Sequence, residues 1–348
     1  MKRNKMLLAT VLVLMVALLA ACGGNNGGAN SGGNNGGTNN EAGADTGGNA
    51  EGSDAPEEAT IRLGYVGGGM TPVAVQIGMN TGAYEEANIN IEATTFSSGA
   101  DMVQALVGGS LDVVLGSYEH VLRQQKNGLG VKAFGEIYNG VGYALVVKSD
   151  SPYQTLADVK GETLAVTKVG SLSHTGLSEG LNEAGLDPDK DVTIINAGSG
   201  ATMFAAIDGD QVAGGMVSEP TLSQMVETGD FRVLYDPEFP FAGIVVMADS
   251  DWVADHEEGM SRFLAVTDEA ASAAKADPAS AVDAMLKEFD QITPEVMEAA
   301  VTNNLRKVPE GLVLSEEGAD KVHQSQLDEG VLTEPIPFDQ AVDLSLLP

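Results

Sequence analysis

The chain has little of three things from which many protein sites are built: cysteine, basic residues and aromatic rings. Its 348 residues include one cysteine, four histidines, 18 Lys+Arg against 50 Asp+Glu, and only 5% aromatic residues. A single cysteine forms neither a disulfide within the chain nor a cysteine-ligated metal site. A formal net charge of −32 at pH 7, with no basic patch to replace phosphate counterions, argues against nucleic-acid binding. The scattered acidic residues are typical of a solvated, acidic surface.

The first 22 residues have the pattern of an export signal. Three basic residues within Met1–Lys5 precede an apolar run, Met6–Leu19, that is too short to span a bilayer comfortably. The run Leu-Ala-Ala-Cys that ends at Cys22 resembles the lipobox of bacterial lipoproteins, in which the cysteine is lipidated. We therefore expect residues 1–21 to be a lipoprotein signal peptide. The lipid on Cys22 would hold the protein on the outer face of the bacterial cytoplasmic membrane. An ordinary signal peptide with an unrelated cysteine is the alternative.

The segment that follows has nothing to bury. Residues 23 to about 56 are mostly Gly, Asn, Ala, Ser and Thr, with Asp and Glu from Glu41 onward, and no apolar residue before Pro56 is larger than alanine. Such a composition predicts a flexible coil. We therefore interpret residues 22–58 as the lipidated cysteine and a tether, with ordered chain from about Ala59. The remainder is long enough for two lobes of ordinary domain size.

From Ala59 onward, short β-rich runs alternate with longer helical ones, which predicts an α/β fold with mainly parallel sheets. The expected strands are 61–66, 89–96, 113–116, 132–137, 143–148, 163–167, 192–196, 213–217, 231–234 and 241–247. From Glu257 to Gly330 the composition is helical, rich in Ala, Glu, Met and Lys.

An internal repeat relates the two halves of this series. Residues 97–117, SSGADMVQALVGGSLDVVLGS, and residues 198–218, GSGATMFAAIDGDQVAGGMVS, align without gaps. Both have the order strand, Ser-Gly, short helix, tight turn, strand, Ser. The general requirements of helix caps are the alternative explanation. Two lobes built on one plan would have matching loops at their strand ends, which suggests a cleft between them.

Candidate ligand-binding residues follow the expected strands, because ligands of open α/β sheets bind beyond the carboxyl ends of the strands. Many of these residues are Ser or Gly at helix starts, where free backbone N–H groups and the helix dipole favour a negative ligand atom. The candidates are Gly68, Ser98, Gly99, Ser117, Tyr118, Gly170, Ser171, Ser199 and Glu219. For each serine, a helix cap that touches no ligand is the alternative. Lys168 and His120 are weaker candidates: a surface lysine explains the first equally well, and a histidine at a helix start is more often structural than a ligand group.

Four stretches of the chain together resemble the ABC-transporter solute-binding proteins of the nitrate, sulfonate and taurine type, which include binders of thiamine precursors. The stretches are IRLGYVGGGMTPVAVQIGMNTGAYEEANINIE, SSGADMVQALVGGSLDVVLGS, YALVVKSDSPYQTLADVKGETLAVTKVGS and LNEAGLDPDKDVTIINAG. The resemblance implies a two-lobed, periplasmic-binding-protein-like fold of type II. Each lobe would be a mainly parallel sheet flanked by helices, and the cleft between the lobes would close on a solute. Lobe I would comprise 59–147 plus 240–348, and lobe II 148–239.

The resemblance also implies a function: the extracytoplasmic solute-binding component of an ABC importer, acting as a monomer and delivering its solute to a membrane permease. The scarcity of aromatic residues near the cleft favours a sulfonate-, taurine- or nitrate-like anion. A thiamine precursor or another heterocycle stays open, and so does a solute-sensing lipoprotein that contacts a receptor. No cofactor is expected.

Enzymatic and metal-binding interpretations are weak. Gly176–Gly180 matches the G-x-S-x-G pattern of serine hydrolases, but its Ser178 is expected inside a helix and not on the sharp turn after a strand. Enzymes of the same fold that make a vitamin precursor are, as the resemblance implies, intracellular and use a cysteine cluster, which this chain lacks. The acidic turns 187–191 and 208–210 do not have the ligand spacing of a calcium loop. We therefore expect no catalytic residue and no metal site.

Overall fold

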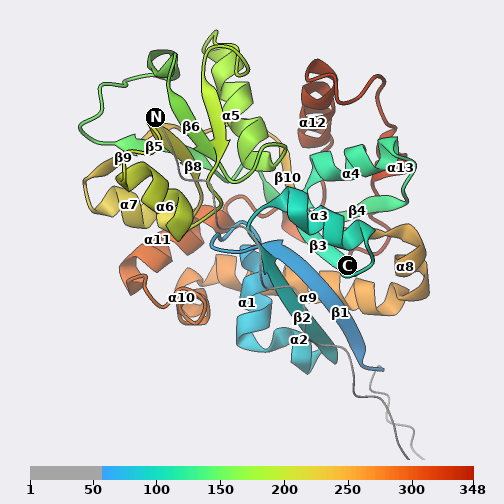
Figure 1. Ribbon diagram of the computed structural model, residues 1–348. Coiled ribbons are helices and arrows are strands. Elements are labelled where there is room, and N and C mark those ends of the chain that lie inside the picture. Colours follow the sequence, from blue (N-terminus) through green and yellow to red (C-terminus); the bar gives the residue numbers. More distant parts are fainter. Residues whose placement is uncertain (1–56) are drawn as a thin grey trace, which may run out of the picture. The chain divides into compact units, whose positions relative to one another are not determined.

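Two five-stranded sheets organise residues 57–348, the part of the chain that the computed structural model describes (Figure 1). Cys22, the expected signal peptide and nearly all of the expected tether lie outside the described residues. The first sheet has the order β2-β1-β3-β10-β4 and the second β7-β6-β8-β5-β9. The strands of the first sheet are β1 (Ala59–Val66), β2 (Ile89–Phe96), β3 (Val113–Ser117), β4 (Val131–Asn139) and β10 (Ala242–Asp249). Those of the second are β5 (Ala144–Lys148), β6 (Thr163–Val166), β7 (Thr193–Asn196), β8 (Gly214–Val217) and β9 (Phe231–Tyr235).

Both sheets are mixed in the same way. β1 pairs in parallel with β2 and β3, whereas β10 lies antiparallel between β3 and β4. In the second sheet β6 pairs in parallel with β7 and β8, and β5 lies antiparallel between β8 and β9. The expected α/β fold with mainly parallel sheets is therefore confirmed, with one antiparallel strand in each sheet.

Each antiparallel strand is the one that the chain enters on crossing from the other sheet. We call the first sheet and its helices lobe I, and the second sheet and its helices lobe II. The chain crosses from lobe I to lobe II between Asn139 and Ala144, and returns between Tyr235 and Ala242. The resemblance puts the boundary between the lobes at residues 147 and 148, within a strand 143–148 that leads into lobe II, whereas the whole of β5 pairs in the second sheet. A β-rich run marks a strand without indicating the sheet in which it pairs.

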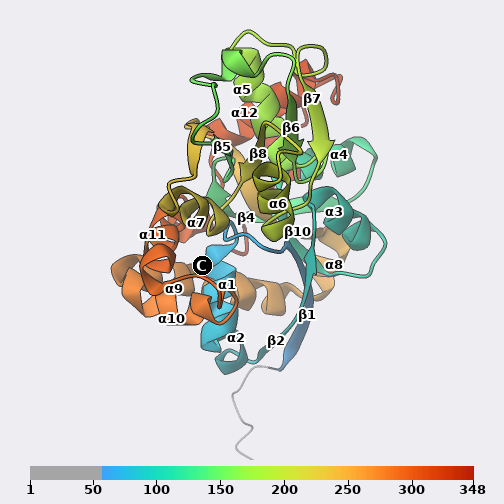
Figure 2. The same ribbon diagram turned by 60° about the vertical axis from the view of Figure 1, so that its left-hand side comes forward.

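Thirteen helices are described, and they cover the sheets as Figures 1 and 2 show. Lobe I carries α1 (Val73–Thr81), α2 (Ala83–Glu86), α3 (Gly99–Val107), α4 (Tyr118–Lys126), α8 (Ser250–Asp255), α9 (Glu257–Ala276), α10 (Pro278–Leu286), α11 (Pro294–Leu305), α12 (Glu316–Asp328) and α13 (Phe338–Ala341). Lobe II carries α5 (Leu172–Glu183), α6 (Ala201–Asp208) and α7 (Thr221–Glu227). Two single turns of 3₁₀-helix lie at Leu156–Val159 and Glu310–Leu312.

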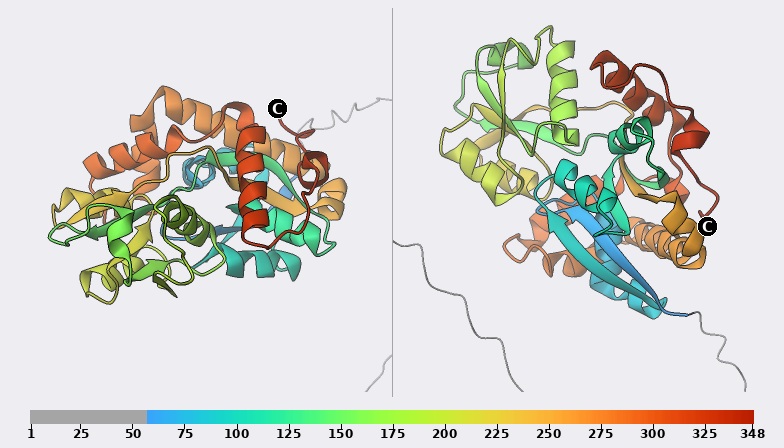
Figure 3. Two further views of the ribbon diagram at one scale, coloured as in Figure 1. Left: turned by 90° about the horizontal axis from the view of Figure 1, so that it is seen from above. Right: turned by 45° about the vertical axis from the view of Figure 1, so that its right-hand side comes forward.

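The C-terminal helices complete lobe I in two places. α9 and α10 pack on α1, while α12 packs on α4 and faces α5 of lobe II (Figure 3). Within residues 57–348 we find no helix with the length and apolar character needed to cross a membrane.

The internal repeat occupies equivalent places in the two lobes. Its first copy contains α3 and β3, its second copy contains α6 and β8, and both strands are the third in their sheets. β3 and β8 are buried along their whole length, so each holds the centre of its lobe. The segments that leave these two strands lead to the space between the lobes.

Candidate ligand-binding cleft

A small cavity lies between the lobes, where parallel strands of both sheets end. Its walls include Val66 at the end of β1, Leu115–Ser117 at the end of β3 and Thr167 just after β6. Its polar lining residues are Thr71, Ser117, His120, Tyr143, Thr167 and Ser171. The cavity measures about 20 Å³, which is space for roughly one water molecule. The lobes therefore meet closely around this cavity, an arrangement that we call closed.

Four helices begin at this cavity. Pro72 precedes α1, Gly99 opens α3, Ser117 precedes α4 and Ser171 precedes α5, and all four residues line the cavity. Each helix start contributes backbone N–H groups and the positive end of a helix dipole. Among the described residues that form the lining there is no lysine or arginine. The backbone is thus the main source of positive potential, an arrangement that suits a small anion.

Three side chains in the lining have a buried polar atom without a hydrogen-bond partner in residues 57–348. They are Ser117 through Oγ, His120 through Nε2 and Ser171 through Oγ. Ser117 and His120 belong to lobe I, and Ser171 belongs to lobe II. Leaving such a group unpaired costs about 1–3 kcal/mol, so three of them around one cavity point to a polar ligand that would satisfy them.

The imidazole of His120 is neutral. Burial, and to a lesser degree the nearby charge of Arg123, lowers the pKa of His120 to about 3. A neutral imidazole nitrogen donates a hydrogen bond in one tautomer and accepts one in the other. His120 can therefore offer an N–H to an anion without carrying a charge of its own.

Gly99 keeps the space between these groups open. A Cβ atom at this position would lie 3.0 Å from Nε2 of His120 and 4.0 Å from Oγ of Ser171. Any side chain at position 99 would therefore stand between the polar atoms of the two lobes.

Two predicted site residues in lobe I do not line the cavity. Ser98 is 1% exposed and caps α3: its Oγ accepts a hydrogen bond from the Asp101 N–H and donates one of 2.8 Å to Oδ2 of Asp101. Tyr118 is fully buried and packs edge-on against the ring of His323, with 5.7 Å between ring centroids. Both side chains act within lobe I.

Three further predicted residues join the lobes beside the cavity. Ser199 Oγ donates a hydrogen bond of 2.8 Å to the carbonyl of Gly67, and the backbone of Gly68 lies against Gly200. The Glu219 carbonyl accepts a 2.8 Å hydrogen bond from the Met70 N–H. Ser98 and Ser199 are equivalent in the repeat, yet one caps a helix and the other crosses between lobes.

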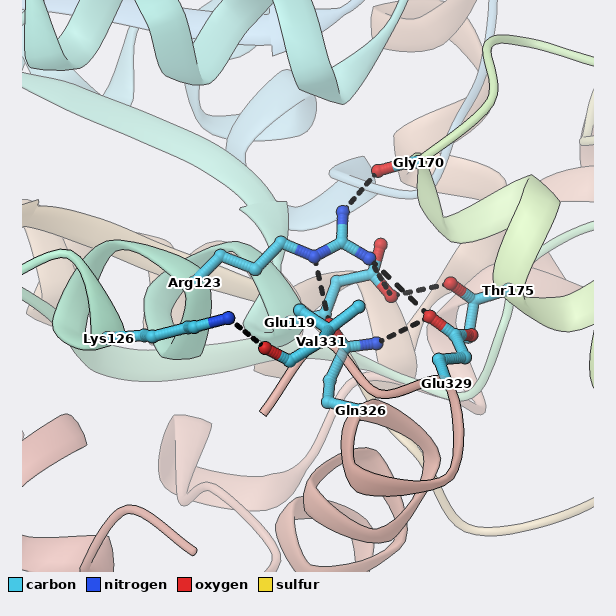
Figure 4. Close-up of polar contacts among 8 residues, drawn as sticks. All are labelled: Glu119, Arg123, Lys126, Gly170, Thr175, Gln326, Glu329 and Val331. Carbon is cyan, nitrogen blue, oxygen red and sulfur yellow. Dashed lines mark hydrogen bonds and ion pairs between the residues drawn. The ribbon is translucent and has the colours of Figure 1, made fainter. Parts of the chain in front are cut away.

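The remaining candidates, Gly170 and Lys168, also make contacts across the cleft. The Gly170 carbonyl accepts a hydrogen bond of 2.7 Å from Nη1 of Arg123 on α4 (Figure 4). Lys168 forms an ion pair with Asp101 of lobe I, in which the two side chains are 39% and 43% exposed. Lys168 is thus engaged at the rim and not in the cavity.

The structure adds Arg123 to the residues that matter at this cleft. Its Nε donates a hydrogen bond of 2.9 Å to Oε1 of Gln326 on α12, so one side chain connects α4, α12 and lobe II (Figure 4). The spacing of Glu119 and Arg123 on a predicted helix is a signal for an ion pair. The contact with Gly170 has no such signal, since it depends on how the lobes meet.

The serine of the serine-hydrolase pattern does not lie where a catalytic nucleophile would have to be. Ser178 lies inside α5 and is 6% exposed, far along the helix from any strand-to-helix turn. Within residues 57–348 no group of three or more His, Cys, Asp or Glu side chains could hold a metal ion.

Comparison with known proteins places these features in a family. The family model described as NMT1/THI5 like matches residues 74–281, a range that runs from α1 through lobe II and back into α10 of lobe I.

Individual proteins agree with this match. A Brucella abortus protein named as a binding protein is 27% identical over 267 residues, which cover 73% of this chain and 78% of that protein. The alkanesulfonate-binding protein SsuA from Xanthomonas axonopodis pv. citri, solved with bound MOPS, is 21% identical with a TM-score of 0.70, covering 83% of this chain and 99% of its own. The ligand-binding component of an ABC-type import system from Staphylococcus aureus, solved with zinc, is 16% identical with a TM-score of 0.69, covering 83% and 98%. The fold is therefore that of the periplasmic binding proteins.

Proposed function

Because this chain belongs to the NMT1/THI5-like family, we propose that it is the extracytoplasmic solute-binding component of an ABC importer and captures a small anion. It is a binding protein and not an enzyme. Its lobes close on the solute by a hinge motion, and the closed form presents the solute to the membrane permease. Lipidation at Cys22 and the tether 22–58 would keep it beside that permease.

One observation carries the proposal: four helix starts and three unpartnered polar atoms surround a single cavity between the lobes. The helix starts supply N–H groups and positive potential for an anionic head group. The hydroxyls of Ser117 and Ser171 and the neutral His120 then supply hydrogen bonds from both lobes. Because the solute would bridge the lobes, binding and closure are coupled.

The lining also favours a small solute over a flat heterocycle. His120 and Tyr143 are the only rings among the described lining residues, so there is little surface on which a pyrimidine could stack. A sulfonate, taurine or nitrate head group needs no such surface. The resemblance in fold to an alkanesulfonate-binding protein supports the same class. Because the cavity has space for about one water, the lobes would have to lie further apart than in this structure both to admit and to hold any of these solutes.

A thermal-shift screen of the purified full chain in detergent tests the proposal. We expect nitrate, taurine or an alkanesulfonate to raise the melting temperature, because a ligand at 100 times its Kd stabilises the folded state by about 2.7 kcal/mol. The double variant Ser117→Ala/Ser171→Ala should lose the shift while it keeps its fold. Stabilisation by thiamine pyrimidines but by no anion would contradict the anionic solute, and an unchanged shift in the double variant would contradict the site.

A further inference from the structure

Arg123 stands at a junction of three elements at the side of the cleft. From α4 it donates hydrogen bonds to the Gly170 carbonyl in lobe II, at 2.7 Å, and to Gln326 on α12, at 2.9 Å. Its guanidinium also faces the carboxylates of Glu119, at 4.0 Å, and Glu329, at 3.9 Å (Figure 4). This cluster has no part in the solute contacts described above.

Two hydrogen bonds of the cluster cross from lobe I to lobe II. Besides the bond from Arg123 to Gly170, Oγ1 of Thr175 on α5 donates a hydrogen bond of 2.6 Å to Oε2 of Glu119. Gly170 directly precedes Ser171, whose hydroxyl faces the solute cavity. Arg123 therefore holds in place the loop that carries a solute-binding group, and both crossing bonds exist only while the lobes are closed.

One cation serves two carboxylates in this cluster. The Glu119 side chain is fully buried and its Oε1 has no hydrogen-bond partner in the described residues, whereas Glu329 is 30% exposed. Burial raises the pKa of Glu119. Burial, and then the negative charge of Glu119, raises the pKa of Glu329 to about 7.

The neighbouring charges come from both lobes. On α5, Glu179 adds negative charge and is itself paired with Lys321 of α12 at 3.0 Å. Burial and the charge of Arg123 lower the pKa of His174 on α5 and lower that of His120 on α4 to about 3.

Lys126, another cation beside the cluster, does not contact the two carboxylates. Lys126 on α4 donates a hydrogen bond to the carbonyl of Val331 (Figure 4). With Lys321 also engaged by Glu179, Arg123 is the cation that faces the Glu119–Glu329 pair among the described residues.

We propose that Arg123 is a positioning residue for solute binding, which holds the Gly170–Ser171 loop against lobe I, and that the carboxyl pair Glu119–Glu329 takes up one proton when the lobes close. The inference rests on the proposed function, since it concerns the closure that solute binding requires. It adds to that function a dependence of closure on pH.

The direction of the pH effect follows from the groups of lobe II that move away from the Glu119–Glu329 pair when the lobes open. Gly170, Thr175 and Glu179 move away with lobe II, so the carboxyl pair regains water and loses the neighbouring charge of Glu179. The pKa of Glu329 then falls from about 7 towards its ordinary value. A group whose pKa is higher in the closed state favours closure at low pH, and this contribution is lost as the pH rises through about 7. For one proton, the ratio of closed to open molecules should be greater at pH 6 than at pH 8 by at most roughly tenfold, because Glu119 and Arg123 stay beside Glu329 in the open form.

The test measures closure without any solute, so its outcome is separate from that of the thermal-shift screen. In the full chain carrying Cys22→Ser, spin labels are placed at Val107→Cys on α3 and Val226→Cys on α7, two side chains that are 44% and 42% exposed in different lobes. The distance distribution between the labels at pH 6 and pH 8 gives the ratio of closed to open molecules.

Three variants distinguish the proton-binding pair from general effects on the fold. Glu329→Gln should make the ratio change less than about twofold between the two pH values, because the variant lacks the second carboxyl group that shares Arg123 with Glu119. Glu317→Gln, an exposed position in the first turn of α12, is the matched control and should keep the full dependence. Arg123→Lys should lower the closed fraction at both pH values, because an ammonium group lacks the fork that reaches Gly170 and the carboxylates together, and should keep the pH dependence.

Two results would overturn the uptake of a proton by the carboxyl pair, and a third would overturn the role of Arg123. The first is an equal ratio of closed to open molecules at pH 6 and pH 8 in the parent chain. The second is a pH dependence in Glu329→Gln that matches that of Glu317→Gln. If Arg123→Lys closes as fully as the parent chain, Arg123 does not position the loop.

Discussion

Two serines of this chain stand at the same place on their helices and do different things. Ser98 precedes α3 and its hydroxyl accepts the hydrogen bond of a helix cap. Ser171 precedes α5, but its hydroxyl makes no cap bond and faces the cavity between the lobes. A serine hydroxyl that precedes a helix without capping it can donate or accept a hydrogen bond to a ligand.

This contrast predicts opposite outcomes for one substitution. Ser98→Ala should lower the free energy of unfolding by about 0.5–2 kcal/mol, the usual cost of a lost cap, and leave solute affinity nearly unchanged. Ser171→Ala should leave stability nearly unchanged and raise the Kd about 10- to 100-fold, because a hydrogen bond to a charged group contributes about 1.5–3 kcal/mol. Urea unfolding and calorimetric titration with the anion that gives the largest thermal shift measure the two quantities.

Each variant is the control for the other. If Ser98→Ala weakened solute binding as much as Ser171→Ala, the distinction between cap and ligand group would be wrong. Loss of stability in Ser171→Ala would likewise mean that its hydroxyl serves the fold.

At the residue scale, sequence reasoning reaches part of this site. Strand ends and Ser-Gly helix starts lead to Gly99, Ser117 and Ser171, which line the cavity. The same rule includes Tyr118, but successive residues of a helix point in different directions, and this ring lies against His323. Arg123 could not be found in this way, because its contact with Gly170 joins residues of different lobes.

At the scale of elements, the two chain segments that cross between the lobes touch each other. The Gly140 N–H donates a hydrogen bond of 2.7 Å to the Phe241 carbonyl. A Cβ atom on Gly243 would lie 1.9 Å from the Gly140 carbonyl oxygen, far inside contact distance. Position 243 is therefore restricted to glycine by the neighbouring crossing segment and not by its own turn.

Gly243→Ala should accordingly destabilise the protein by about 1–3 kcal/mol, the usual cost of overpacking, or more if the backbone cannot move. A matched control is Gly259→Ala, where the new Cβ would make one close contact, 3.0 Å from the Cβ of Ala59, and where alanine is the better helix former. Urea unfolding of both variants gives the comparison. A Gly243→Ala variant as stable as the control would contradict the close contact between the crossing segments.

The strands themselves were predictable, and their pairing was not. The run 89–96 coincides with β2, and the other expected strands agree with observed ones to within a few residues, because β-branched runs bounded by glycine and proline are a strong local signal. Partner and direction depend on distant residues. The sequences of the antiparallel strands β5 and β10 therefore show the same apolar pattern as those of the parallel strands.

At the scale of the whole molecule, the repeat and the order of the elements gave the two-lobed plan. The closed state of the cleft could not have been foreseen, because it depends on contacts between side chains from both lobes, such as Lys168 with Asp101 and Lys321 with Glu179. Most of these ion pairs are partly exposed, and each contributes about 0–1 kcal/mol. These ion pairs therefore add little to the stability of the closed form.

The proposed lipid anchor at Cys22 would matter to function because it keeps the protein near its permease. A protein that only captures solute must still meet its permease, and a flexible tether raises the effective concentration of one beside the other. We expect the full chain expressed in a bacterial host to incorporate labelled fatty acid and Cys22→Ser to incorporate none, with Ser31→Ala, a tether position, as the control. Because Cys22 is the only cysteine of the chain, label that persists in Cys22→Ser could not come from a second thioether site. Such label would mean a lipid attached at another kind of site. A parent chain without label would show that the Leu-Ala-Ala-Cys sequence is not a lipidation signal, and the protein would then have to reach its permease by diffusion.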